Sequence, residues 1–274
     1  MIHKDPPQFR LRRIFLVLSS LFCYTVIITV NISRKGNPAL KISTILFDLD
    51  GTLLPMDQDR FVKYYFGLLA KKLAPLGYDP EQLIQGIWKG IGAMVKNDGS
   101  VTNMDAFWNC FNQVMGRNAR QDEPIFRHFY ENEFNTVKAV CGFNPKAAET
   151  VKAIKEKGFR VALATNPIFP AIATENRTHW AGLDVTDFEY FTSYENSRHC
   201  KPNPAYYQDV CDALGVSPEE CVMVGNDAIE DTAAEKLGIQ VFLLTDCLIN
   251  KDNRDISGYP HGSFDDLMQF IHTL

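Results

Sequence analysis

The chain has 274 residues, of which 46% are hydrophobic and 22% are charged. This balance is typical of a globular protein with a sizeable core, and the length allows one large domain or a core with a smaller inserted domain. The net charge of −5 argues against nucleic-acid binding through bulk positive charge. Seven cysteines without a C-x-x-C pair indicate reduced thiols in a cytoplasmic protein and argue against a zinc site.

The amino-terminal segment, residues 1–42, differs from the rest of the chain. Ile14 to Ile32 is almost wholly apolar and is flanked on both sides by arginine and lysine. At about 1.5 Å per residue, a helix of this length just crosses a bilayer core. One interpretation is a membrane anchor that tethers a cytoplasmic domain. The other is that translation begins near Leu40 and the segment is an over-extended start; both interpretations stay open.

The first predicted strand of the folded part is followed at once by two acidic residues. Thr44 to Phe47 is an apolar run with β-branched members, which is typical of a buried strand. Asp48 and Asp50 come next, and side chains two residues apart in extended backbone leave on the same side. Open α/β sheets bind their ligands at this carboxyl edge. Because two neighbouring carboxylates repel each other, the pair predicts a shared cation or proton.

Residues 57–140 show helical spacing of apolar residues and no convincing strand. The breaks in this pattern fall at three turn-forming stretches, and four helices packed as a small bundle are the simplest interpretation. The breaks are Pro75-Leu76-Gly77, Asn97-Asp98-Gly99 and Gly116-Arg117-Asn118.

From residue 141 onwards, predicted helices and strands alternate. This rhythm predicts an α/β fold with a doubly wound, Rossmann-like parallel sheet, to which residues 43–56 and 141–274 contribute. The predicted strands are Phe159 to Ala164, Phe188 to Thr192, Cys221 to Val224 and Gln240 to Leu244. The predicted helices are Pro145 to Lys157, a stretch near Ala171, Ala205 to Leu214, Glu230 to Leu237 and Phe264 to Thr273.

Polar residues with useful chemistry follow the later elements as well. Thr165 and Asn166 end the second strand, where a hydroxyl and backbone N–H groups can hold a phosphate oxygen, although Thr165 could equally be a helix cap. Lys201 precedes a proline-rich helix start; a lone lysine there is usually a solvated surface residue. Asp227 and Asp231 follow the predicted strand Cys221 to Val224 and lie four residues apart, so both side chains can face one point. Asp227 could also be a simple N-cap.

Taken together, these motifs resemble the four signatures of the haloacid dehalogenase-like superfamily, most of whose members are magnesium-dependent phosphatases. The likeness covers Ser43 to Leu274, and the helical insert at 57–140 resembles the cap domain of that family. The similar motifs are Asp48-x-Asp50-Gly51-Thr52-Leu53, the strand end at Thr165, Cys200-Lys201-Pro202, and Gly225-Asn226-Asp227 with Asp231.

The resemblance implies a role for each of these residues. Asp48 would attack phosphorus and form an aspartyl-phosphate, Asp50 would act as general acid and base, and Lys201 would offset negative charge. The implied phosphate-binding residues are Thr165, Asn166 and Lys201, and the implied ligands of Mg²⁺ are Asp48, the backbone carbonyl of Asp50, Asp227 and Asp231.

Several points depart from the family pattern or stay open. Pro55 stands where the family often has another aspartate, and Asn226 is not the commonest residue before Asp227. Asp50 favours phosphate-ester chemistry over dehalogenation, because a halide leaves without a proton. A phosphomutase, a nucleotide phosphatase and a non-catalytic, membrane-tethered binding protein remain alternatives to the phosphatase of a small phosphorylated metabolite.

The motifs assign neither the substrate-selecting residues nor the oligomeric state. The turn at Lys96 and Asn97 is a candidate for reaching the cleft, as are Arg198 and His199 just before Lys201. Exposed side chains beside a loop are the plainer interpretation of the second pair.

Overall fold

The computed structural model describes residues 41–274, which contain a single five-stranded sheet with all neighbouring strands parallel. The strand order is β2-β1-β3-β4-β5, so the first strand lies at the interior of the sheet. The strands are β1 Thr44–Phe47, β2 Arg160–Leu163, β3 Cys221–Gly225, β4 Gln240–Leu244 and β5 His261–Gly262.

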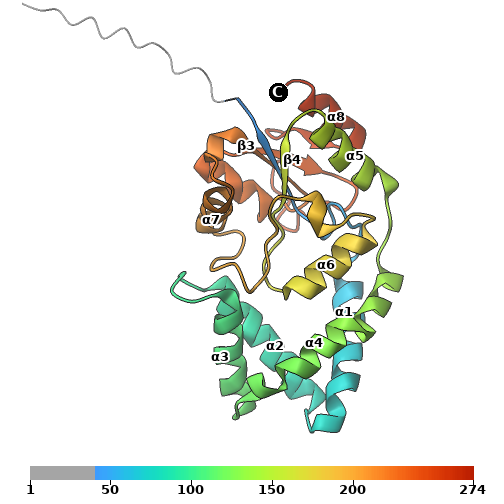
Figure 1. Cartoon of the computed structure of the whole chain (residues 1–274), viewed down its shortest axis with the longest axis vertical. Helices are drawn as coiled ribbons and strands as arrows, with labels where there is room; N and C mark the ends of the chain where they lie inside the picture. The colour runs from blue at the N-terminus through green and yellow to red at the C-terminus, as the bar shows by residue number, and fades with distance from the viewer. Residues whose placement is uncertain (1–40) are drawn as a thin grey trace, which may run out of the picture. The chain divides into compact units, whose positions relative to one another are not determined.

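Helices cover both faces of this sheet, which explains why its strands are continuous apolar runs. Ile45 and Phe47 of β1 belong to the apolar cluster that includes the helices α5 and α8, whereas Leu46 packs in a separate cluster with α7. Figure 1 shows α5 and α8 on one side of the strands and α7 on the other. The predicted doubly wound α/β fold is confirmed. These helices are α5 Pro145–Glu156, α6 Ala171–Trp180, α7 Pro204–Leu214 and α8 Phe264–Ile271.

Between β1 and β2 the chain forms helices, as the spacing predicts. Figure 1 shows them together, at one end of the described part of the chain and away from the sheet. Their core is aromatic: Tyr65 contacts Phe129 and Phe134 with ring centroids 5.9 Å apart in both cases. The helices are α1 Gln58–Leu73, α2 Pro80–Val95, α3 Asn103–Met115 and α4 Glu123–Glu131, followed by the 3₁₀ helix η3 Glu133–Val140.

Three local predictions differ from the structure. The segment 188–192 is not a strand; it runs beside β2 but completes one isolated bridge, between Phe191 and Leu163. The predicted helix at 230–237 is a 3₁₀ helix, η6 Asp231–Leu237. The short strand β5 was not predicted, because two residues are too few to carry a periodic pattern.

The predicted membrane segment Ile14 to Ile32 lies outside the described residues. Within residues 41–274, no helix combines the length and the apolar character needed to cross a membrane.

Candidate active site

Asp48 directly follows β1, an interior strand of the sheet. Its backbone N–H donates to the Val224 carbonyl at 2.9 Å, and the residue as a whole is only 7% exposed. The Thr52 hydroxyl donates to Asp48 Oδ2 at 3.0 Å. The turn between them needs Gly51, which has φ +88° and on which a Cβ would lie 2.2 Å from Asn226 Nδ2. The hydrogen bond from Thr52 and the turn at Gly51 therefore fix the position of the Asp48 carboxylate at the strand end.

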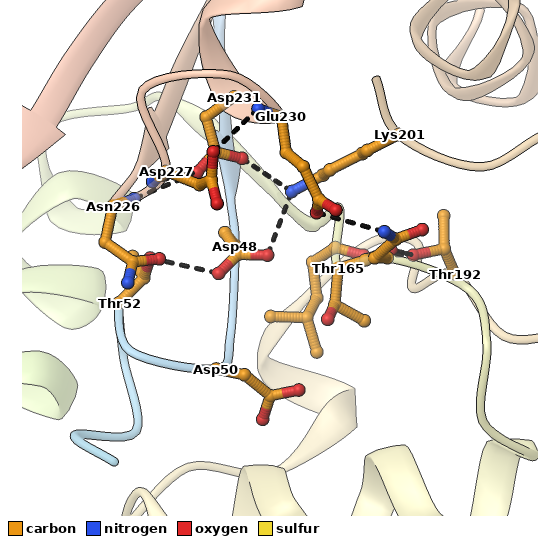
Figure 2. A network of polar contacts seen from close by, with 12 residues as sticks. Asp48, Asp50, Thr52, Thr165, Thr192, Lys201, Asn226, Asp227, Glu230 and Asp231 are labelled. Atoms are coloured by element: carbon orange, nitrogen blue, oxygen red, sulfur yellow. Dashed lines mark hydrogen bonds and ion pairs between the residues drawn. The ribbon is translucent and has the colours of Figure 1, made fainter. Parts of the chain in front are cut away.

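Lys201 joins two acidic groups from different parts of the chain. Its fully buried ammonium donates to Asp48 Oδ1 at 2.9 Å and to Asp231 Oδ1 at 2.7 Å. Figure 2 shows the ammonium between the two carboxylates. A buried lysine is stable only when it is paired, so these contacts exclude the solvated surface role for Lys201.

Burial and ion pairing have opposite effects on the pKa values of Asp48 and Lys201. Burial raises the pKa of Asp48 from 3.8 to about 7, although the Lys201 ammonium opposes the rise. Burial acts to lower the pKa of Lys201, but Asp231 and Asp48 outweigh it and keep that pKa well above its ordinary value. Lys201 is therefore the fixed positive charge of the site, and the charge of Asp48 depends on what binds beside it.

The turn after β3 places Asp231 and Asp227 differently. Asp231 Oδ2 accepts the backbone N–H groups of Asn226 and Asp227, both at 2.9 Å, and its other oxygen accepts from Lys201. Gly225 permits this packing, because a Cβ there would lie 2.1 Å from the Asp231 carboxylate. Asp227 Oδ1 accepts from the N–H of Glu230 at 2.9 Å, so Asp227 does cap its own turn.

Asp50 has a partner that the motifs did not indicate. Its Oδ2 accepts from Arg177 Nη1, and Arg177 is a fully buried residue of α6 whose guanidinium lies 4.4 Å from the Phe169 ring centroid. Asp50 Oδ1 is buried and has no hydrogen-bond partner among residues 41–274. An arginine inside a helix carries no sequence signature, so only the fold reveals this pair.

Just after the end of β2, two hydrogen bonds to the backbone carbonyl of Thr165 fix the position of this residue. The Thr165 carbonyl accepts from the Thr192 hydroxyl at 2.6 Å and from the Tyr206 hydroxyl at 2.8 Å. Next to it, Asn166 Nδ2 donates to Glu230 Oε2 at 3.0 Å. Burial raises the pKa of Glu230 from 4.5 to about 8, although Lys201 opposes the rise. Glu230 is thus a further acidic residue of the site that the motifs did not indicate.

Six of the predicted site residues line one cavity of about 250 Å³. The seventh, Lys201, does not line it but donates hydrogen bonds to two of the six. The six that line the cavity are Asp48, Asp50, Thr165, Asn166, Asp227 and Asp231.

The oxygen donors of this cavity fit a magnesium ion that keeps part of its water shell. Mg²⁺ in proteins commonly takes one or two carboxylates, several waters and a substrate phosphate oxygen. Asp48 and Asp227 line the same cavity and can supply the carboxylates. Both oxygens of Asp231 are already occupied by Lys201 and by backbone N–H groups, so Asp231 fits a supporting role. Among residues 41–274, no three acidic, histidine or cysteine side chains form a ready-made metal cage.

The proposed specificity residues of the loops do not line the cavity. Asn97 donates to the Val101 carbonyl and to Asn103 Oδ1, which stabilises its own turn. Arg198 donates to the Gly99 carbonyl at 3.1 Å, and His199 pairs with Asp209 at 2.7 Å. The prediction that Lys96 and Asn97 reach the cleft is therefore wrong for this structure; the turn instead contacts the segment before Lys201.

Comparison with known proteins decides the family. The model of the haloacid dehalogenase-like hydrolases matches residues 42–243. The chain belongs to this family. The predicted family is therefore confirmed.

Relatives with assigned names and solved structures agree with the match. The chain is 26% identical over 237 residues to a phosphoglycolate phosphatase of Shigella dysenteriae, covering 83% of this chain and 86% of the relative. It is 25% identical over 208 residues to the pyrophosphatase PpaX of Halalkalibacterium halodurans, covering 73% and 82%. The crystal structure of a HAD phosphatase from Thermococcus onnurineus is similar with a TM-score of 0.53 at 17% identity, covering 84% of this chain and 97% of that one. This last likeness concerns the fold.

Proposed function

We propose that the chain is a magnesium-dependent phosphatase that hydrolyses a small phosphorylated metabolite through an aspartyl-phosphate on Asp48. Its class, a hydrolase acting on phosphate esters, follows from the family match and its phosphatase relatives. The observation that carries the finer proposal is the buried ammonium of Lys201, which donates at 2.9 Å to Asp48, a residue that lines one cavity with Asp50 and Asp227. This arrangement sets an acid, a fixed cation and a candidate nucleophile around one space.

The first half of the reaction transfers the phosphoryl group to the protein. A carboxylate oxygen of Asp48 attacks phosphorus, and the bond between phosphorus and the ester oxygen breaks. Asp50 gives its proton to that leaving oxygen, so the alcohol departs neutral. Arg177 holds Oδ2 of Asp50 and leaves the unpartnered Oδ1 for this proton.

The second half returns the enzyme to its starting state. Asp50, now a carboxylate, takes a proton from a water molecule, and the resulting hydroxide oxygen attacks phosphorus. Inorganic phosphate leaves and the Asp48 carboxylate is regenerated. Lys201, Thr165 and Asn166 would bind the phosphoryl oxygens as charge moves between the attacking and leaving groups.

Bound Mg²⁺ would offset the negative charges of the phosphoryl group and of Asp48, so that the two can approach. The residues that would hold it are Asp48, Asp227 and the backbone carbonyl of Asp50, with Asp231 supporting the turn. The chemistry of the donors, which are all oxygen atoms, supports this choice of ion.

Replacing Asp48 with asparagine tests the proposal. Asp48→Asn keeps the shape of the side chain and removes the nucleophilic charge, so we expect phosphate release from a panel of phosphate esters with Mg²⁺ to fall by about 10³-fold or more. Circular dichroism should show an intact fold. Asp57→Asn is the matched control, because Asp57 is an exposed cap of α1 and asparagine caps equally well, so its activity should stay at the wild-type level.

Two results would overturn the proposal. If Asp48→Asn hydrolysed esters as fast as the wild type, Asp48 would not be the nucleophile. If the wild type released no phosphate from any ester with Mg²⁺, or moved a phosphoryl group within a sugar phosphate without releasing phosphate, the chain would be a binding protein or a phosphomutase.

We also propose that the helices of residues 57–140 are a cap domain over a core of residues 43–56 and 141–274. The shared cavity supports this division, because α1 and α2 supply one wall and the turns after β1, β2 and β3 supply the other.

A further inference from the structure

The wall of the cavity opposite the carboxylates is almost entirely apolar. Of the nineteen lining residues within 41–274, ten are apolar or aromatic, and five have aromatic rings. These rings come from the helices α1 and α2 and from the turn after β2. They belong to Phe61, Tyr65, Phe66, Trp88 and Phe169.

The tyrosine in this wall offers no charge, and its hydroxyl is already hydrogen-bonded. Burial raises the pKa of Tyr65 to about 12, so the phenol is neutral at ordinary pH. Its hydroxyl is hydrogen-bonded to the Tyr130 hydroxyl at 2.8 Å, inside the helical region. Tyr65 therefore presents a ring to the cavity.

Positive charge is confined to the other end. Among the described residues that line the cavity there is no lysine, arginine or histidine. The two cations nearby, Lys201 and Arg177, are fully buried and are already paired with Asp48 and Asp231, and with Asp50. A second anionic group on a substrate would thus meet apolar side chains and no partner, which is costly for a buried charge.

The size of the cavity limits the leaving group. Its volume of about 250 Å³ exceeds the roughly 150 Å³ of a cavity that holds benzene. It lies below the range of about 300–1,000 Å³ that is usual for drug-sized ligands. A phosphoryl group with one ring fits within this volume.

We infer that the substrate is a phosphate monoester of a neutral, apolar alcohol with about one ring, and that Trp88 contacts this leaving group. The inference rests on the proposed phosphatase function and makes that function narrower. It separates this chain from the activities in the names of its relatives, because phosphoglycolate and pyrophosphate each carry a second anionic group. Trp88 is placed for the contact: it lines the cavity, is 50% exposed, and packs edge-on against Phe66 at 5.5 Å.

Three esters of primary alcohols test the inference, because they differ only in what the alcohol carries. They are benzyl phosphate, propyl phosphate and 2-phosphoglycolate, the last two being similar in size but different in charge. We expect kcat/KM with Mg²⁺ to be about tenfold or more higher for benzyl than for propyl phosphate, and lowest for phosphoglycolate. A preference for phosphoglycolate over propyl phosphate would overturn the inference and leave the phosphatase proposal intact.

Replacing Trp88 tests the contact itself. Trp88→Ala should reduce the ratio of kcat/KM for benzyl over propyl phosphate by about fivefold, mainly through KM, because a ring contact is lost. Tyr64→Ala is the matched control: Tyr64 is an aromatic residue of α1 that is 40% exposed and does not line the cavity. An unchanged ratio in Trp88→Ala, or an equal fall in Tyr64→Ala, would remove the assigned contact.

Binding measurements keep the inference testable if no ester is hydrolysed. Phenethylphosphonate, butylphosphonate and 3-phosphonopropionate imitate the three esters and cannot be cleaved, and their binding with Mg²⁺ can be measured by calorimetry. Tighter binding of the aromatic phosphonate would support the apolar specificity even if hydrolysis, and with it the proposed function, failed. Binding of none of them, or preferred binding of 3-phosphonopropionate, would overturn the inference.

Discussion

Each of the two acids proposed for the chemistry has one oxygen held by a buried cation. Lys201 holds Asp48 and Arg177 holds Asp50, and both cations are fully buried. Such pairs are expensive to bury and add little to stability, so their value lies in fixing the positions of the carboxylates. The second oxygen of each acid has no cation beside it among residues 41–274: Asp48 Oδ2 accepts from the Thr52 hydroxyl, and the buried Asp50 Oδ1 has no hydrogen-bond partner.

Glu230 should make the stability of the metal-free protein depend on pH. Its pKa is about 8 in the folded protein and 4.5 ordinarily, so the folded state holds a proton that the unfolded state has released between these values. Raising the pH from 4.5 towards 8 therefore destabilises the fold, and above 8 the effect is complete. Glu230→Gln removes the ionisation, and Asn166 can still donate to the amide oxygen. At pH 8.5 in EDTA we expect a gain of about 1 kcal/mol or more, or about 2–4 °C in Tm.

Thermal melts of this variant at pH 5 and pH 8.5 check the prediction. The gain should nearly vanish at pH 5, where the folded carboxyl is already protonated. Glu149→Gln is the control, because Glu149 is an exposed carboxylate of α5 and should change Tm little at either pH. Equal Tm values for Glu230→Gln and the wild type at both pH values would mean that Glu230 is charged at little cost in the fold.

Among the elements, α2 packs closely against α3 at two glycines of α2. Gly90 of α2 faces Phe107 of α3, and a Cβ built on it would lie 2.5 Å from the Phe107 ring. Gly86, one turn earlier, lies in the same way against Phe111 and Met115. Since α2 also carries Trp88 and Ile91 to the cavity, this contact sets the position of the apolar wall.

Gly90→Ala should destabilise the protein although alanine favours helices. The gain in helix propensity is about 0.5–1 kcal/mol, whereas overpacking a tight contact costs about 1–3 kcal/mol, so we expect a net loss of about 1 kcal/mol. Urea unfolding measures the difference. Gly92→Ala is the matched control in the same helix, because a Cβ there meets nothing within 4 Å and should stabilise by about 0.5–1 kcal/mol. Equal stability of the two variants would show that α2 shifts easily against α3.

The same elements show how far sequence reasoning reaches. β1 and β4 were predicted to the residue, because a buried parallel strand is a continuous apolar run that ends at a polar turn. The segment 188–192 has a similar composition and exchanges backbone hydrogen bonds with β2, but it completes only one bridge, at Phe191. Composition does not tell whether a neighbouring strand offers a full ladder.

The candidate site likewise contains residues that the sequence could predict and residues that it could not. Asp48, Asp50 and Asp227 could be predicted because they follow strands directly, at fixed spacing in the chain. Arg177 could not, because it comes from the middle of α6 and meets Asp50 across 127 residues of sequence. The apolar wall was visible only as helical stripes, since periodicity says that a ring is buried and not which space it faces.

Across the described part of the chain, the helical region is joined to the sheet through Asn103. This residue is fully buried at the start of α3, and its Nδ2 donates to the carbonyls of Pro167 and His199 at 3.3 and 3.2 Å. Its backbone N–H donates to the Ser197 carbonyl at 2.8 Å. One side chain thus connects the helical insert to the turn after β2 and to the segment before Lys201.

Asn103→Ala should loosen this junction. The carbonyls of Pro167 and His199 lose their donor in a buried place, which costs about 1–3 kcal/mol. We expect a lower Tm, and faster amide hydrogen exchange concentrated in residues 97–103 and 197–201, where the two regions meet. Asn135→Ala is the control, because the Asn135 side chain donates to the Glu131 carbonyl in an exposed position and its loss should affect exchange only nearby. If exchange in Asn103→Ala rose evenly over the chain, Asn103 would stabilise the fold as a whole and not specifically the contact between the helical insert and the segment before Lys201.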